Sequence, residues 1–326
     1  MVNNYALIHH RAAMIHEQMA EAWRLLQGQM THDEFFAAEN PYYKLLDQLY
    51  AEEYPLARLL ENSDLVFHAE GPDTKGYLPS IHAINWLVGG AEKQLRLLAK
   101  AIFDLTESSA NHLAKNLDIR LTGFAPGSIY AGVKLQPGDG DVFFDGDQEP
   151  VFVTVRSAIR QLSIIPGFVD DEGLNAGIYE AMPDPAARDA GLTAAYRLSP
   201  TGRLGIHTVE LFVPGQKPSE LSQRERVVIH DALKKPKLHS KKHGTFTGEF
   251  REVDLDKTRF HLRNISGVGT LRCVFPEVTA EAVRPLLGST VEVTGEYEMD
   301  GRGRPRFMLV SSFKRIETAK QEEMSL

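Results

Sequence analysis

The chain has 326 residues, of which 43% are hydrophobic and 25% charged, and its formal net charge is −8. This length predicts two domains, or three at most. No stretch reaches the roughly eighteen apolar residues that a membrane-spanning helix needs, and the N-terminus lacks the features of a secretory signal. The single cysteine, Cys273, excludes an intrachain disulfide framework and a cysteine-based zinc site. We therefore expect a cytoplasmic, bacterial protein.

The charge is spread unevenly. Residues 234–243 hold five lysines and no acidic residue, and the residues after them hold 12 basic and 13 acidic side chains. The first 233 residues hold 19 basic and 31 acidic side chains, a net charge of −12. Because such an acidic surface repels polyphosphates, any nucleic-acid affinity is expected at the lysine run and beyond it.

The first hundred residues show helical periodicity. Apolar residues recur at three- and four-residue steps from Ala12 to Leu26, and Thr31 and Glu34 have capping-box spacing. The pattern predicts helices within residues 11–62 and 79–106, with a loop at Phe67–Gly76. Gly89-Gly90 inside the second helix predicts a kink, a break or close packing of another backbone, because glycine is unfavourable in a helix interior.

From Asp118 the apolar period changes to two. The pattern predicts strands at 118–124, 128–135, 194–198 and 206–213, helices at 184–192 and 222–233, and a strand running into a helix over 151–165. Helices come first and strands later, without the regular alternation of a doubly wound sheet. We therefore interpret residues 1–233 as an α+β domain.

After the lysine run the pattern is β throughout. Alternating or β-branched segments occur at 245–250, 259–263, 269–275, 290–297 and 306–310, and a short helix is predicted at 280–287. Glycines at 248, 267, 269, 295 and 301 suit bulges or tight corners. These features predict a Lys-rich linker at 234–243, a closed five-stranded barrel at 244–316 and a flexible tail at 317–326. The fold class is thus α+β, with a small all-β barrel after the helical and mixed-sheet region.

This tail resembles a known superfold. The segments Phe260-His-Leu262, Leu271-Arg-Cys273 and Val291-Glu-Val-Thr-Gly295 are similar to those of an OB-type barrel, as in a group of uncharacterised bacterial proteins. The resemblance covers about a quarter of the chain and implies an oligonucleotide-binding face on the second and third strands. The candidate residues on those strands are Arg259, Phe260, His261, Arg263, Arg272 and Phe275. However, alternation places Phe260 and Arg259 on opposite faces, which separates aromatic from basic side chains.

The candidate nucleic-acid contacts lie beside the barrel. They are Lys234, Lys235, Lys237, Lys241, Lys242, Arg302, Arg304 and Arg306. The lysine run is interpreted first as an exposed linker, and alternatively as an arm that offers about five phosphate contacts.

No catalytic, cofactor or metal signature is found. The acidic loop at 139–149 gathers five carboxylates, and Phe143 stands where an EF-hand needs a ligand, so a solvated turn is preferred to a cation site. His9, His10 and His16 are interpreted as part of an exposed helix. Cys273 is expected to be a buried, inert thiol.

Gly127 and Ser128 follow a proline in a predicted tight hairpin. They match neither a phosphate-binding loop nor the Gly-x-Ser-x-Gly elbow of a serine nucleophile. We interpret them first as the hairpin, and alternatively as a loop that binds an anion or small ligand.

The sequence favours a non-enzymatic binding or adaptor protein. Its N-terminal domain would mediate protein contacts or self-association, and its barrel would engage a protein or nucleic-acid partner. The resemblance implies a role in bacterial stress or phage defence. No cofactor and no membrane contact are expected. The alternative is an enzyme or small-ligand sensor with a pocket in the N-terminal domain near Gly127 and Ser128.

Overall fold

The computed structural model describes residues 5–75, 78–104, 117–125, 127–136, 150–254, 258–275 and 283–316. The chain divides into two compact units, each built from separate stretches of sequence. Unit 1 comprises residues 1–92, 117–147 and 198–223. Unit 2 comprises residues 93–116, 148–197 and 224–326, so that it combines the barrel with two stretches that precede it in the sequence.

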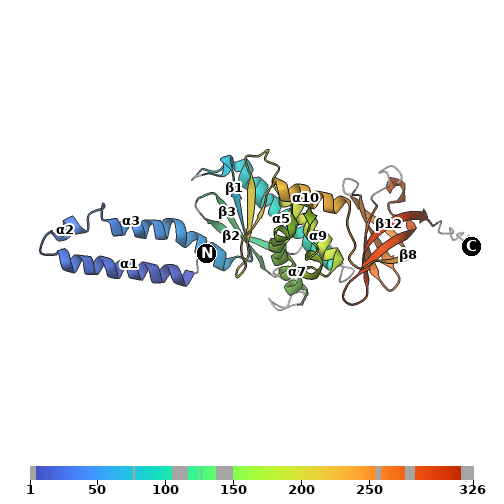
Figure 1. The fold of residues 1–326 in the computed structure, drawn as a ribbon, viewed down its shortest axis with the longest axis horizontal. Helices are drawn as coiled ribbons and strands as arrows, with labels where there is room; N and C mark the ends of the chain where they lie inside the picture. Colours follow the sequence, from blue (N-terminus) through green and yellow to red (C-terminus); the bar gives the residue numbers. More distant parts are fainter. Residues whose placement is uncertain are drawn as a thin grey trace, which may run out of the picture. The chain divides into compact units, whose positions relative to one another are not determined.

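Unit 1 begins with a helical hairpin. Its elements are α1 (Tyr5–Leu26), α2 (His32–Phe35), α3 (Pro41–Gln48), a π-helical turn (Leu49–Glu53) and α4 (Tyr54–Asn62). α1 lies alongside α3 and α4, and Ile8, Ala12, Leu49 and Ala57 are buried between them (Figure 1). Thr31 and Glu34 form the predicted capping box at the start of α2. The apolar stripe read from the sequence is therefore the packing face of this hairpin.

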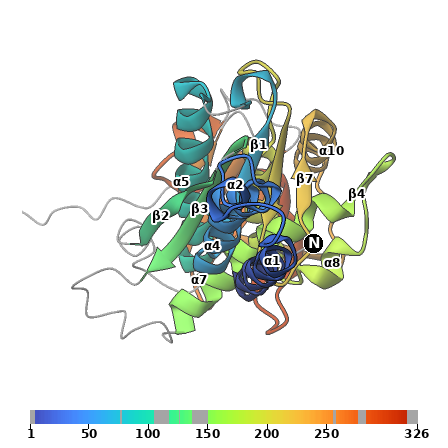
Figure 2. The same cartoon turned by 90° about the vertical axis from the view of Figure 1, so that its left-hand side faces the viewer.

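The rest of unit 1 is built on an antiparallel sheet of five strands. The strands lie in the order β2 (Asp118–Ala125), β3 (Ile129–Gln136), β1 (Leu65–Glu70), β6 (Thr208–Phe212) and β7 (Ser219–Leu221). α4 packs against β1, β2 and β3 (Figure 2). A 3₁₀ turn (Pro72–Thr74) follows β1, and α5 (Ile81–Asp104) begins in unit 1 and ends in unit 2. β1 is thus the central strand that joins the two hairpins of the sheet.

Unit 2 contains a group of helices beside the barrel. They are the second half of α5, α7 (Pro150–Gln161), a 3₁₀ segment (Leu162–Phe168), α8 (Ile178–Ala181), α9 (Pro185–Leu198) and α10, whose bounds are Gln223–Lys234. Two short strands, β4 (Val169–Asp170) and β5 (Gly173–Leu174), pair between the 3₁₀ segment and α8.

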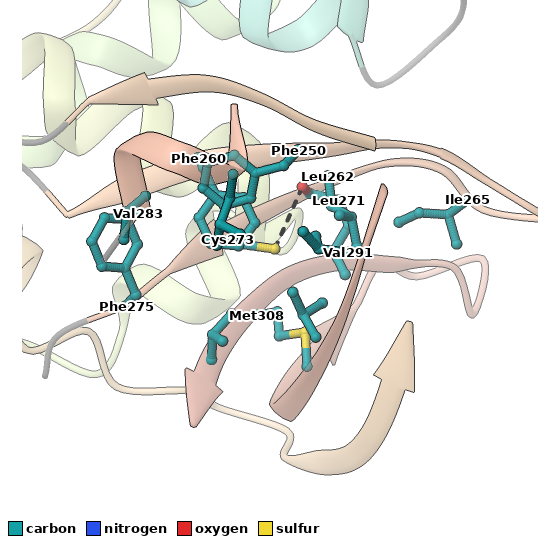
Figure 3. Close-up of a cluster of buried hydrophobic side chains, with 13 residues drawn as sticks. Phe250, Phe260, Leu262, Ile265, Leu271, Cys273, Phe275, Val283, Val291 and Met308 are labelled. Atoms are coloured by element: carbon teal, nitrogen blue, oxygen red, sulfur yellow. Dashed lines mark hydrogen bonds between the residues drawn. The ribbon is translucent and has the colours of Figure 1, made fainter. Parts of the chain in front are cut away.

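The barrel is closed and its five strands are mixed in direction. β8 (Lys242–Asp254), β9 (Arg259–Ile265), β10 (Gly269–Val274), β11 (Thr290–Met299) and β12 (Pro305–Arg315) close in the order β10-β12-β11-β8-β9. The pair β10–β12 is parallel and the other pairs are antiparallel. A 3₁₀ turn (Arg284–Leu286) precedes β11. Inside lies an apolar cluster in which Phe250 and Phe260 stack and Cys273 is fully buried (Figure 3).

Gly295 in β11 shows why the barrel needs one of its glycines. A Cβ atom at this position would lie 2.0 Å from the backbone oxygen of Leu309 in β12. The register between β11 and β12 shifts at Thr294 and Gly295. The sequence prediction of a bulge at this glycine is confirmed, because a close backbone approach at the bulge excludes a side chain.

Two neighbouring residues of α9 connect this helix to the barrel. Arg188 donates two hydrogen bonds of 2.9 Å to the carboxylate of Glu298 in β11. Asp189 accepts hydrogen bonds from Arg259 in β9, at 2.7 Å from its Nη2, and from Arg272 in β10. All five side chains are at most 14% exposed. The helix and barrel of unit 2 thus share a buried, fully paired charge cluster.

Most predicted strands are confirmed, and so is the α+β class. The strands predicted at 118–124, 128–135 and 206–213 correspond to β2, β3 and β6, and all five barrel strands are present. Of the helix predicted at 280–287, residues 284–286 form the 3₁₀ turn, whereas 280–282 lie outside the described residues.

Three local predictions are wrong. Residues 67–70 belong to β1, which is buried along five of its six residues and therefore lacks the alternation that marks a half-exposed strand. Residues 194–198 form the end of α9, and 151–161 are helical from Pro150 onward. Both segments bury residues at helical spacing, and this packing decides the structure. Val155, Ile159 and Leu162 are buried in the first segment, and Ala194, Ala195 and Leu198 in the second.

Two of the three explanations predicted for the glycine pair in α5 are excluded, while the predicted kink stays a prediction. α5 runs without a break from Ile81 to Asp104, and a Cβ atom at Gly89 or Gly90 would meet no atom within 4 Å. Neither a break nor close backbone packing therefore explains the two glycines.

We predict that Asp189→Asn destabilises the protein by about 3–5 kcal/mol, because it removes the buried carboxylate that the guanidinium groups of Arg259 and Arg272 share. Urea unfolding followed by circular dichroism measures the loss. The control is Glu296→Gln, which removes an exposed pair with Lys241 of 3.0 Å and should cost less than about 1 kcal/mol. An equal, small effect of both substitutions would contradict the prediction.

The same cluster predicts acid sensitivity. Burial by itself would raise the pKa of Asp189, but Arg259 and Arg272 outweigh it and hold this pKa well below its usual range. The hydrogen bond from His261, together with Lys100, lowers the pKa of Glu252 to about 2. A depressed carboxyl pKa contributes stability that is present above the unfolded-state value of about 4 and is lost as the pH falls toward the folded-state value.

We therefore expect the free energy of unfolding to fall between about pH 4.5 and pH 2. Asp189→Asn should flatten this decline, since the amide cannot take up the proton that the carboxylate takes up on unfolding. Urea midpoints at several pH values in this window compare the two slopes. Identical slopes for the variant and the wild type would show that Asp189 does not contribute.

Candidate functional site

The predicted lysines surround the start of the barrel. Lys234 is the last residue of α10 and Lys242 the first of β8, and all five lysines of the run are exposed. Leu238, in the middle of the run, is 7% exposed and packs with Val274 and Phe307. The run is thus fixed at its middle while its charged side chains face outward.

The strand register brings the lysine run close to the predicted arginine loop. Lys242 pairs with Tyr297 of β11, which leads directly into the β11–β12 turn. In that turn Arg302 is exposed, and the side chain of Arg304 lies 2.9 Å from Asp300. The two basic segments therefore meet at one end of the barrel, although acidic side chains neutralise part of the charge.

Arg306 is placed differently from the expected exposed loop. It is the second residue of β12, its exposure is 2%, and its Nε lies 3.7 Å from Asp184. The side chain therefore points into the protein, because β12 begins one residue earlier and alternation turns this position inward.

The basic side chains of the second and third barrel strands are already bound within the protein. Arg259 and Arg272 contact Asp189, while His261 and Arg263 contact Glu252 at 3.0 and 2.7 Å. Phe260 and Phe275 lie in the barrel core (Figure 3). The predicted separation of aromatic and basic side chains on β9 is confirmed.

The remaining predicted positions are the acidic loop, the histidines of α1 and Cys273. The acidic loop at 139–149 lies outside the described residues. His9, His10 and His16 all lie on α1, and within the described part of the chain no group of three His, Cys, Asp or Glu residues could hold a metal ion. Burial raises the pKa of the Cys273 thiol, as expected for an inert cysteine.

Ser128 belongs to a hydrogen-bonded chain that crosses three strands of unit 1. His68 lies on β1, and Glu210 is its direct partner on β6. The Nδ1 atom of His68 lies 2.6 Å from Oε2 of Glu210, and its Nε2 atom is hydrogen-bonded to Oγ of Ser128, the residue before β3. Because the Glu210 carboxylate can only accept, Nδ1 carries the proton; in the neutral ring Nε2 then accepts from the serine hydroxyl, and Oε1 of Glu70 lies 3.5 Å from the same nitrogen.

The imidazole ring is held from its face as well as its edges. Tyr130, the direct partner of His68 on β3, stacks on it at 3.8 Å between ring centroids and 3° between ring planes. The His68 side chain is 4% exposed. Burial and the nearby carboxylates of Glu210 and Glu70 raise the pKa of Tyr130, so its hydroxyl stays neutral. Tyr130 therefore fixes the ring orientation without adding a charge.

A cavity of about 420 Å³ opens beside Ser128. Its wall includes Gly127 and Ser128, together with Glu70, Lys75 and His207. Gly127 and Ser128, the residues of the ligand loop that the sequence offered as an alternative, therefore line this cavity. Gly127 has a φ of +119°, which favours glycine and turns the chain into β3 at the cavity edge.

The arrangement has the geometry of a nucleophile with its base. A hydroxyl bonded to Nε2 of a histidine, whose Nδ1–H is oriented by a carboxylate, can lose its proton to the ring as the oxygen attacks a carbonyl carbon. Sequence reasoning missed His68 and Glu210, because residues 68, 128 and 210 have no motif spacing. Only the pairing of β1 with β3 and β6 brings them together.

Comparisons with known proteins assign no function to either unit. A scan against protein-family models, a search of curated proteins and a search of solved structures each found no match. Among the described residues, no helix is both long and apolar enough to cross a membrane.

Proposed function

We propose that unit 1 is a hydrolase domain in which Ser128 is the nucleophile, His68 the general base and Glu210 the group that orients His68. The observation that carries this proposal is the continuous chain of hydrogen bonds from Glu210 through His68 to Ser128 at the edge of a cavity. This is the enzyme alternative that the sequence left open, with the pocket near Gly127 and Ser128.

The reaction proceeds in two steps. Oγ of Ser128 attacks the carbonyl carbon of an ester or amide while its proton moves to Nε2 of His68, and His68 then protonates the leaving group. Water then gives a proton to Nε2 of His68 as it attacks the acyl-serine, and His68 returns that proton to Oγ of Ser128 as the acid leaves. Glu210 stabilises the imidazolium formed in each step, and Lys75 in the cavity wall is the cation available to the developing oxyanion.

We expect a fluorophosphonate probe to modify Ser128 covalently, because such probes react with hydroxyls that a histidine activates. Peptide mass spectrometry locates the adduct. Ser128→Ala and His68→Gln should abolish it, and each should slow hydrolysis of p-nitrophenyl acetate by roughly 10³-fold or more. Glu210→Gln should slow hydrolysis by roughly 10²-fold or more, because an amide no longer holds the proton of His68 on Nδ1 or stabilises the imidazolium.

The matched control for labelling is Ser240→Ala, since Ser240 is exposed and distant in the sequence. Circular dichroism of each variant verifies folding. An unlabelled Ser128 in folded wild-type protein, or hydrolysis that persists in Ser128→Ala, would overturn the proposal.

A second function is proposed for the barrel, which we regard as an OB-type domain that binds a partner. Numbered from β8, its strands close in the order one-two-three-five-four, with a short helical turn before the fourth strand. This order supports the OB resemblance of the sequence. The exposed lysines near Tyr297 and the turn with Arg302 favour a nucleic-acid partner over a protein partner at this end of the barrel.

The binding or adaptor role, protein contacts or self-association through the N-terminal domain, and participation in bacterial stress or phage defence remain parts of this second proposal. Because Arg259 and Arg272 are engaged by Asp189, the proposed contact uses the basic end of the barrel and not the face of its second and third strands.

We predict weak, salt-sensitive binding of labelled single-stranded DNA in a mobility-shift assay at low ionic strength. Replacing Lys235, Lys237 and Lys242 together by alanine should weaken binding and reduce the slope of log affinity against log salt by about 2, since each lost phosphate contact contributes about 0.7. The control replaces the equally exposed Lys44, Lys93 and Lys217. Absence of any shift, or equal loss in the control, would exclude this contact.

A further inference from the structure

A second cavity, of about 190 Å³, lies entirely within unit 2 and is independent of Ser128. Its wall is formed by the second half of α5, by α9 and by strands β8, β9 and β10 of the barrel. The volume corresponds to about six water molecules at liquid density. It therefore suits a molecule the size of an amino acid or a small hydroxy acid.

Two side chains in this wall have polar atoms without a protein partner. Gln94 of α5 is 4% exposed, and among the described residues its Oε1 atom forms no hydrogen bond within the protein. The same holds for Oγ1 of Thr193 on α9. An unpaired buried polar group costs about 1–3 kcal/mol, so two of them at one cavity indicate that a bound molecule supplies the missing bonds.

The charges around the cavity favour an anion. Its described wall contains four permanent cations, Lys100, Arg197, Arg259 and Arg272, against the carboxylates of Glu252 and Asp254. Asp189, which is not part of this wall, binds Arg259 and Arg272 and neutralises one further charge. His261 lines the same wall, and Arg263 contacts Glu252.

Lys100 and Arg197 are the cations best placed to take a ligand. Lys100 pairs with Glu252 at 2.9 Å and Arg197 with Asp254 at 3.4 Å, and both side chains are only partly buried. A ligand carboxylate can share these cations without first breaking a buried pair, whereas Arg259 and Arg272 are held by Asp189.

We propose that this cavity binds a small carboxylate that also carries a hydroxyl or amino group. The ligand donates a hydrogen bond to Oε1 of Gln94 and exchanges one with the hydroxyl of Thr193, while Lys100 and Arg197 bind its carboxylate. Because α5, α9 and the barrel all contribute to the cavity wall, a ligand bound there contacts all three and stabilises unit 2 against unfolding.

The test uses the full chain and a panel of lactate, malate, tartrate, serine, glutamate and glutamine. Thermal unfolding identifies the compounds that raise the midpoint, and isothermal titration measures their affinity. At least one member of the panel should bind, and both Gln94→Met and Thr193→Val should weaken it at least tenfold. Both substitutions retain the side-chain size but remove the hydrogen-bonding atoms.

The thermal stability of the variants without ligand gives a second test, in which the substitution is expected to be neutral or favourable although it weakens binding. Because Oε1 of Gln94 has no partner among the described residues, Gln94→Met should leave the midpoint of the ligand-free protein unchanged or raise it. Gln18→Met, on the exposed surface of α1, is the matched control and should change neither stability nor affinity. The proposal fails if no member of the panel binds, if binding survives both substitutions, or if Gln94→Met clearly lowers the midpoint of the ligand-free protein.

Discussion

The pairing of β1 with a strand on each side is the interaction on which unit 1 depends. β1 is bonded to β3 and to β6, and five of its six residues are buried, so the two hairpins of the sheet would separate without it. The same pairing places Tyr130 and Glu210 directly opposite His68. Cross-strand partners on one face lie about 5 Å apart, which is within reach of side-chain hydrogen bonds and ring stacking. The strand that holds the sheet together therefore also builds the candidate site.

Unit 2 depends on a different kind of contact. Arg188 and Asp189 are adjacent on α9 and have opposite charges, and each finds its complement on the barrel. Buried charges of this kind add little net stability compared with an apolar contact, but they tolerate only one arrangement of their partners. They also occupy Arg259 and Arg272 on β9 and β10, the strands on which the OB resemblance implied an oligonucleotide-binding face. The cluster thus explains why the barrel can resemble a nucleic-acid-binding fold while that face serves its own chain.

The proposed activities rest on separate parts of the molecule and can fail separately. The hydrolase proposal depends on one histidine and its two partners in unit 1, whereas the nucleic-acid proposal depends on exposed charge at one end of the barrel. The small-carboxylate cavity depends on polar atoms of α5 and α9 that lack partners in the protein. A molecule bound there would contact helix and barrel together, which makes unit 2 suited to sensing a ligand.

The sequence by itself determined the features that local periodicity controls. Alternation predicted the five barrel strands and the separation of Phe260 from Arg259, and three- and four-residue spacing predicted the N-terminal helices. Local patterns failed for β1, which is buried on both faces, and for the end of α9, where packing overrode β-like composition. The meeting of Ser128 with His68 and Glu210, and of Asp189 with Arg259, was decided only by the tertiary structure. These residues lie 60 or more positions apart, and only strand pairing and helix packing set the distances between their side chains.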